Sequence, residues 1–182
     1  MADCSDANRQ SFVCGGMILG AAHALCLGVA RIHDAPCAAL RDSRFLLDVI
    51  LSIGLTPDAR GSWLYGNASR FMVSASGFGA NRVGLWQEPL QISAALAHLA
   101  RSAPISTYLE VGVFSGWTCV VMSAFLSRLA GRRDGFRAAA VDIDRTHLSL
   151  GTSSLLARHN ASFIFRHRLQ PWLDATPLID LW

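Results

Sequence analysis

Apolar and polar positions in the second half of the chain alternate with the periods of strands and helices in turn. Short apolar runs bounded by turn residues predict strands, and the longer segments between them have the apolar spacing of helices. The predicted order is strand 107–111, helix 116–130, strand 137–142, helix 146–158 and strand 161–166. Strands that alternate with helices pair in parallel, so the pattern predicts part of a doubly wound α/β sheet.

The part of the chain before residue 104 predicts helices joined by irregular segments. Residues 44–53 and 87–103 carry apolar positions on one helical face, whereas residues 61–85 are rich in Gly, Ser and Asn and favour turns around short strands. The expected divisions are an N-terminal tail (1–34), a helical and irregular lead-in (35–103) and the α/β part (104–182).

The longest apolar run covers residues 12–30, where His23 is the only strongly polar side chain. As a helix rising about 1.5 Å per residue, it would span about 28 Å, just enough for a hydrocarbon core. Three interpretations stay open: a membrane anchor, a cleaved signal peptide or a buried core helix. The first two together are favoured by length and by Arg31, although four glycines weaken the insertion signal. Membrane or secretory-pathway localisation is therefore expected slightly ahead of cytoplasmic.

Composition narrows the classes of partner. The net charge of +3 is too small to indicate nucleic-acid binding, and the basic cluster is interpreted as a solvated helix end and loop, namely Arg128, Arg132, Arg133 and Arg137. The five cysteines lack Cys-x-x-Cys or metal-ligand spacing, so no metal site is predicted. Cys119 is expected to be a buried thiol, and disulfides among the other four require an oxidising compartment.

The most informative segment is 108–118, which predicts a strand that ends in a glycine-rich turn and opens a helix. Gly112 and Gly116 would let the backbone approach a bound group closely, and the helix beginning there presents unpaired N–H groups. Glu110 and Asp142 end neighbouring predicted strands, where ligands bind in parallel sheets. The Asp142 carboxylate is suited to accept hydrogen bonds from two ribose hydroxyls. The segment therefore predicts a site for a nucleotide-like cofactor.

The glycine spacing excludes two common cofactor-binding loops. The turn lacks the middle glycine of a dinucleotide fingerprint, and no Gly-Lys-Ser/Thr follows it as in a phosphate loop. The remaining Glu-x-Gly-x-x-x-Gly pattern, with Ala-Val-Asp-Ile-Asp downstream, resembles class I S-adenosylmethionine-dependent methyltransferases of the small-molecule O-methyltransferase type over residues 85–182. This resemblance implies a Rossmann-like core, S-adenosylmethionine as cofactor and a small-molecule methyl acceptor. It also implies a cofactor pocket formed by Glu110, Gly112, Val113, Phe114, Ser115, Gly116, Thr118, the ribose ligand Asp142 and the adenine neighbour Ile143.

The chain departs from that family in its strand number. The family's sheet has seven strands, whereas this chain is expected to supply three and, at 177–182, the opening of a fourth. We therefore expect a partial domain whose exposed sheet edge favours self-association. Two functions stay open: a methyltransferase, active or inactivated by truncation, and a non-catalytic membrane-anchored or interaction module derived from the same fold. His147, His159 and His167 are candidate bases that are more often surface residues, so the catalytic residue stays unassigned.

Overall fold

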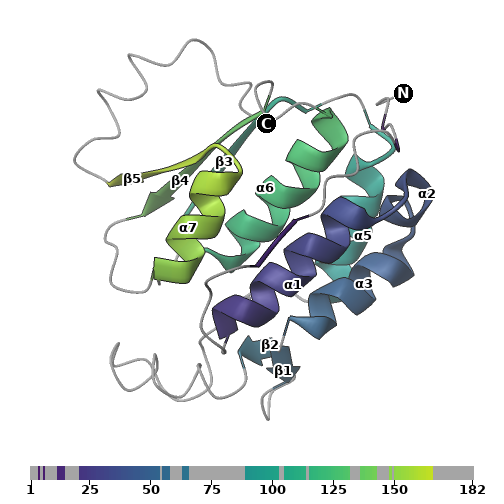
Figure 1. The fold of residues 1–182 in the computed structure, drawn as a ribbon, viewed down its shortest axis with the longest axis horizontal. Helices are drawn as coiled ribbons and strands as arrows, with labels where there is room; N and C mark the ends of the chain where they lie inside the picture. The colour runs from purple at the N-terminus through teal and green to yellow at the C-terminus, as the bar shows by residue number, and fades with distance from the viewer. Residues whose placement is uncertain are drawn as a thin grey trace.

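The computed structural model describes residues 4, 6, 12–14, 21–53, 55–57, 63–65, 89–102, 105–113, 115–131, 136–142, 148 and 150–165 (Figure 1). The described elements are α1 (Ala21–Asp34), α2 (Cys37–Leu40), α3 (Ser43–Ser52), β1 (Leu55–Pro57), β2 (Trp63–Tyr65), α5 (Pro89–Leu99), β3 (Thr107–Val111), α6 (Trp117–Ala130), β4 (Arg137–Asp142), α7 (Leu150–Arg158) and β5 (Ala161–Phe165). The protein is therefore a mixed α/β fold, and the predicted strand at 177–182 lies outside the described residues.

The larger sheet is parallel and has the order β3-β4-β5. Helix α6 connects β3 to β4, and α7 connects β4 to β5. Because the strands follow one another in a single direction, right-handed crossovers place both helices on the same face of the sheet. Figure 1 shows α6 and α7 side by side in front of the strands. The predicted alternation of parallel strands and helices is confirmed, with strand bounds that agree to one residue.

A second group of helices packs on the outer side of α6. Helix α1 contacts α6 and α3, and α3 contacts α5 (Figure 1). Gly28 makes the close approach of α1 and α3 possible, because a Cβ at this position would overlap Ile53 Cγ2. Helix α3 begins after Asp42, whose carboxylate accepts a hydrogen bond from the Arg44 N–H at 2.9 Å. Strands β1 and β2 pair antiparallel as a separate two-stranded sheet.

The prediction of a membrane-spanning helix in residues 12–30 is wrong. Within the described part of the chain, no helix is both long enough and apolar enough to cross a membrane. Helix α1 covers Ala21–Asp34, and its 14 residues rise about 21 Å. Four of its apolar side chains are buried in the protein core, namely Leu25, Cys26, Val29 and Ile32, whereas Leu27 is 50% exposed. Protein rather than lipid therefore covers this apolar surface.

The main core lies between the sheet and the helices. Ala138 and Ala140 of β4 face it, and their small side chains let α6 pack closely, with Phe125 fully buried. A small second hydrophobic cluster lies on the opposite face of the sheet and is formed by Leu109, Ala139 and Val141. Strand β3 is less buried than β4, and Val111 at its carboxyl end is 73% exposed. The carboxyl end of β3 is therefore an open part of the sheet.

Candidate functional site

The glycine-rich turn connects the carboxyl end of β3 to the first residue of α6. Gly112 and Gly116 both have a φ of +79°, in the left-handed region that favours glycine. The Gly112 N–H donates to the Val141 carbonyl at 2.9 Å and extends the β3–β4 ladder by one bond. The Gly116 N–H donates to the Val113 carbonyl at 2.8 Å, which closes the turn. The turn is thus anchored to β4 before the helix starts.

The two glycines serve different purposes. A Cβ at Gly116 would lie 2.7 Å from both Leu148 Cδ1 and Thr152 Cγ2, so this glycine allows the turn to pack against α7 and the segment before it. A Cβ at Gly112 would meet no atom within 4 Å. Gly112 therefore borders open space at the carboxyl edge of the sheet, and its backbone is accessible to a bound group.

Two acidic residues lie at the same carboxyl edge of the sheet. Glu110 pairs with Ala140 in the parallel register, and Asp142 follows two residues later on β4. From strand spacing and rise, the Cα atoms of the two acids are about 8 Å apart. Both share the sheet face of Ala138 and Ala140, which is the face toward α6. The predicted pair of acids at neighbouring strand ends is therefore present on one face.

Glu110 has an altered acidity. The Tyr108 hydroxyl donates to Glu110 Oε2 at 2.6 Å, and this bond favours the ionised carboxylate. Burial has the larger effect and raises the pKa of Glu110 to about 7. The same environment raises the pKa of Tyr108 and of the Cys119 thiol, through burial first and through the nearby Glu110 second. Near neutral pH, Glu110 can therefore exist in either charge state.

The remaining predicted cofactor residues divide by exposure. Three residues of the turn are buried, namely Val113, Ser115 and Gly116. Thr118, in the first turn of α6, is half-buried. Phe114 and Ile143 lie outside the described residues. The predicted cofactor residues at the open carboxyl edge are therefore Glu110, Gly112 and Asp142.

His159 is neither a surface residue nor close to this edge. It is buried, its Nε2 lies 3.0 Å from His33 Nε2, and its Nδ1 lies 2.7 Å from the Leu155 carbonyl oxygen. It precedes β5 at the opposite end of the sheet, and Ala161, the first residue of β5, already lies about 13 Å along the strand from the level of Asp142. The surface assignment of His159 is therefore wrong, while His147 and His167 lie outside the described residues.

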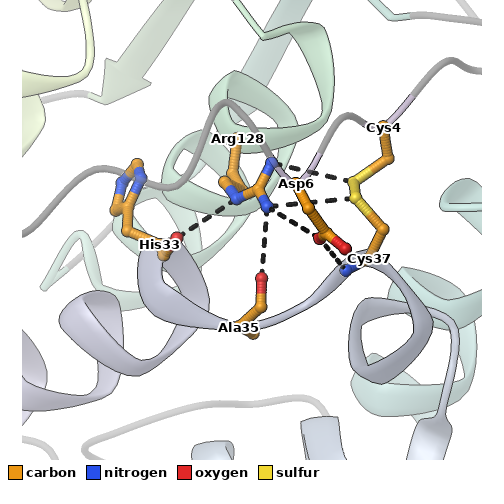
Figure 2. Close-up of a disulfide and its surroundings, with 6 residues drawn as sticks. All are labelled: Cys4, Asp6, His33, Ala35, Cys37 and Arg128. Carbon is orange, nitrogen blue, oxygen red and sulfur yellow. Dashed lines mark hydrogen bonds and ion pairs between the residues drawn. A yellow bond between two sulfur atoms is a disulfide. The ribbon is translucent and has the colours of Figure 1, made fainter.

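Arg128 forms a second polar centre that the sequence interpretation missed. Its side chain is fully buried, so its assignment to a solvated helix end is wrong. Nε donates to the His33 carbonyl at 3.2 Å and Nη2 to the Ala35 carbonyl at 3.1 Å (Figure 2). These carbonyls lie at the end of α1, where the helix dipole favours a cation. Arg128 is the only charged residue of α6, a signal that could have indicated a buried, bonded guanidinium.

Two disulfides attach the segments before α1 to the helices. Cys4 is bonded to Cys37 and Cys14 to Cys26. Such bonds persist in oxidising compartments. Cys119 is buried, as predicted, and is not part of a disulfide. Across the part of the chain that the structure describes, no three His, Cys, Asp or Glu side chains are grouped as a metal site.

No protein-family model, curated protein or solved structure matches the chain. Function must therefore be inferred from the site itself.

Proposed function

We propose that the carboxyl edge of the β3–β4–β5 sheet binds S-adenosylmethionine and that the protein is a methyltransferase with a Rossmann-like core that acts on a small molecule. The observation that carries this proposal is the open space at Gly112, which follows the end of β3 at the same sheet edge as Glu110 and Asp142. In parallel α/β sheets, ligands bind outside the carboxyl ends of the strands. The strand order and the placement of α6 and α7 on one face support the same architecture.

The residues at this edge suit the parts of the cofactor differently. The Asp142 carboxylate can accept hydrogen bonds from two adjacent ribose hydroxyls. The bare backbone at Gly112 permits an approach that any side chain would hinder. Glu110, when ionised, supplies negative charge toward a cationic group. When bound, S-adenosylmethionine supplies an electrophilic methyl group on a positively charged sulfonium. The protein's main contribution is then to hold the acceptor atom in line with that methyl group.

Binding of S-adenosylhomocysteine to the intact chain tests this proposal by isothermal titration calorimetry. We expect Asp142→Asn to weaken binding at least tenfold, because an amide replaces the double acceptor for the ribose. Asp34→Asn is the matched control, since Asp34 is an exposed acid at the end of α1. Circular dichroism verifies that each variant is folded. Absence of binding by folded protein, or equal affinities of Asp142→Asn and the control, would refute the proposal.

A second candidate function is a non-catalytic interaction module that uses the edge of β3. Within the described strands, β3 is hydrogen-bonded to β4 on one side, and its Val111 side chain is 73% exposed. Open edges pair with strands of other chains, and lysine on an edge strand opposes such pairing. We expect Val111→Lys to reduce concentration-dependent self-association in analytical ultracentrifugation. Leu150→Lys on α7, which is 92% exposed, should leave it unchanged. Identical sedimentation of both variants and wild type would exclude this use of the edge.

A further inference from the structure

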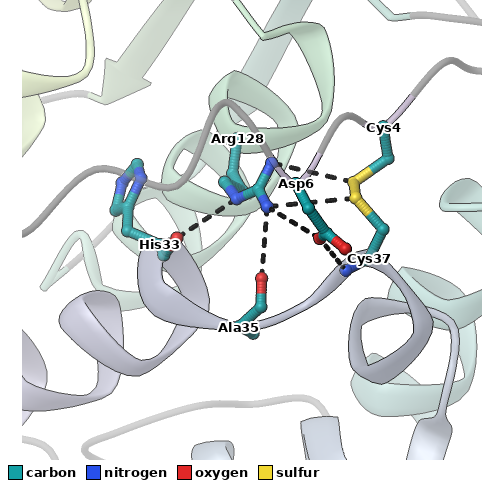
Figure 3. Close-up of polar contacts among 6 residues, drawn as sticks. All are labelled: Cys4, Asp6, His33, Ala35, Cys37 and Arg128. Carbon is teal, nitrogen blue, oxygen red and sulfur yellow. Dashed lines mark hydrogen bonds and ion pairs between the residues drawn. A yellow bond between two sulfur atoms is a disulfide. The ribbon is translucent and has the colours of Figure 1, made fainter.

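The Cys4–Cys37 disulfide lies against the buried guanidinium of Arg128. Arg128 Nη1 is 3.7 Å from Cys4 Sγ, and Nη2 is 3.9 Å from Cys37 Sγ (Figure 3). Both cysteines are half-buried, so part of each residue is exposed to solvent. We propose that this bond is a thiol-exchange site, which small thiols or dithiols reduce reversibly because Arg128 stabilises the thiolate that leaves.

Arg128 is fixed by contacts that do not depend on the disulfide. The His33 and Ala35 carbonyls bind its Nε and Nη2, so the guanidinium keeps its place when the sulfurs separate. A guanidinium stays charged at any physiological pH. Its side chain is fully buried, and reduced solvent screening strengthens its attraction for an anion. Thiolates beside a fixed cation are better leaving groups and are held more firmly once formed.

Asp6 competes for the same guanidinium. Its Oδ1 lies 3.9 Å from Arg128 Nη2 and accepts the Cys37 N–H at 2.8 Å (Figure 3). The Asp6 side chain is 58% exposed, so water weakens its hold on Arg128. Asp6 therefore moderates the stabilisation of a thiolate without abolishing it. Removing its charge should make the disulfide easier to reduce.

The Cys14–Cys26 disulfide provides a comparison within the same molecule. Cys26 is fully buried among the apolar residues of α1, an environment that disfavours a thiolate. Loop entropy acts in the opposite direction, because the sequence separations are 33 residues for Cys4–Cys37 and 12 for Cys14–Cys26. That difference favours the longer loop's disulfide by about fivefold. An arginine at close range favours an anion by about tenfold to a thousandfold. The Arg128 effect therefore predominates.

The exchange proceeds in two balanced steps. A thiolate of a dithiol attacks one cysteine sulfur, so that a mixed disulfide forms, the Cys4–Cys37 bond breaks and the electron pair leaves on the other sulfur beside Arg128. The second thiolate of the reductant then attacks the mixed disulfide and releases the remaining cysteine. Two electrons pass from the dithiol, which becomes a disulfide, to the two cysteine sulfurs. Of the dithiol's two protons, one ends on the cysteine released as a thiol and one goes to solvent, because the other cysteine stays a thiolate beside Arg128.

Contacts elsewhere in the segment before α1 preserve the fold during exchange. The Phe12 ring stacks on His33 and His159 with centroids 5.1 and 5.4 Å away, and the Arg158 guanidinium lies 3.8 Å from the Phe12 centroid. Cys14–Cys26 joins the same segment to α1. Reduction of Cys4–Cys37 alone therefore leaves Phe12 in the core, as a reversible reaction requires.

Redox titration of the intact oxidised protein tests the proposal. The chain is equilibrated in mixtures of reduced and oxidised dithiothreitol, quenched with acid and alkylated, and each cysteine is quantified by mass spectrometry. We expect half-reduction of Cys4–Cys37 at a reduced-to-oxidised ratio at least about twofold lower than that for Cys14–Cys26, because the smallest Arg128 effect, about tenfold, exceeds the opposing loop effect of about fivefold. Equal ratios for the two bonds would overturn the proposal.

Charge variants separate the effect of Arg128 from simple accessibility. Asp6→Asn, which keeps an acceptor for the Cys37 N–H, should lower the ratio needed for Cys4–Cys37 at least threefold further. Arg128→Gln should raise the reduced-to-oxidised ratio at which Cys4–Cys37 is half-reduced. The control Arg31→Gln, which removes an exposed ion pair with Asp48, should leave this ratio unchanged. Should Arg128→Gln fail to fold, Asp6→Asn decides by itself, because its side chain is largely exposed. No shift, or a shift toward harder reduction, in Asp6→Asn refutes the role of Arg128.

Discussion

Protonation of Glu110 is expected to make the stability of the protein fall as the pH rises. Burial raises the pKa of this carboxyl from its ordinary value of 4.5 to about 7 in the folded protein. A higher pKa in the folded state means that folding favours the bound proton. The stabilisation is therefore fully present below about pH 4.5, decreases above it and is lost once the pH has passed about 7.

The two pKa values set the size of this effect. Each pH unit between 4.5 and about 7 contributes about 1.4 kcal/mol, so the full difference is about 3 kcal/mol in the free energy of unfolding. Most of it falls between pH 5 and pH 8. Glu110→Gln removes the titration and keeps an amide oxygen that can accept the Tyr108 hydroxyl hydrogen bond. The variant should therefore lose less stability over this range than the wild type does.

Urea unfolding of both proteins at pH 5, 6, 7 and 8 measures the effect. Other titrating groups, histidines included, contribute equally to both proteins and cancel when the two pH profiles are subtracted. The subtracted profile should decline by about 2 to 3 kcal/mol from pH 5 to pH 8. Parallel profiles would show that Glu110 titrates in the folded protein as it does in the unfolded chain. The conclusion that burial raises the pKa of Glu110 would then be wrong.

Glycine substitutions at three positions test the backbone arguments. Gly131 directly follows α6 and serves as the control, because it has a φ of +70° and lies at the end of the helix remote from the turn. Gly112→Ala, at φ +79°, and Gly131→Ala should each cost about 1 to 2 kcal/mol in urea unfolding. Only Gly112→Ala should also weaken S-adenosylhomocysteine binding in calorimetry. Equal affinities would remove Gly112 from the site. Gly28→Ala should cost about 1 to 3 kcal/mol through overlap with Ile53, and in an Ile53→Ala background its cost should nearly vanish. Additive losses would contradict the close approach of α1 and α3.

The α/β part of the chain could be predicted because its signals are local. Strand β4 is an apolar run closed by Asp142, and α6 starts directly after Gly116, as the spacing of the glycines indicates. Hydrophobic periodicity and turn residues depend on fewer than ten neighbouring positions, so they can be recognised in the sequence without knowledge of tertiary contacts. The placement of Glu110 and Asp142 at the same edge of the sheet could be predicted from the strand order alone. The pKa of Glu110 did not, since it depends on what buries the carboxyl.

Features near the N-terminus could not be predicted because long-range contacts determine them. An apolar run has the same composition whether lipid or protein covers it, and the contact of Gly28 with Ile53 is what marks α1 as a packed helix. Four cysteines allow three pairings, and the choice depends on which segments converge on α2. Arg128 shows the same limit: its charge suggests solvent, while its partners come from residues 33 and 35, far away in the sequence.

Helix α6 carries both proposed sites at its two ends. Gly116 precedes its first residue in the glycine-rich turn, and Arg128 lies in its last turn against the end of α1. Twelve residues of helix separate them by about 18 Å, beyond the range at which substitutions usually interact. Asp6→Asn should therefore change the redox equilibrium of Cys4–Cys37 and leave S-adenosylhomocysteine affinity unchanged, and Asp142→Asn should do the reverse. An effect of either variant at both sites would contradict the independence of the two sites.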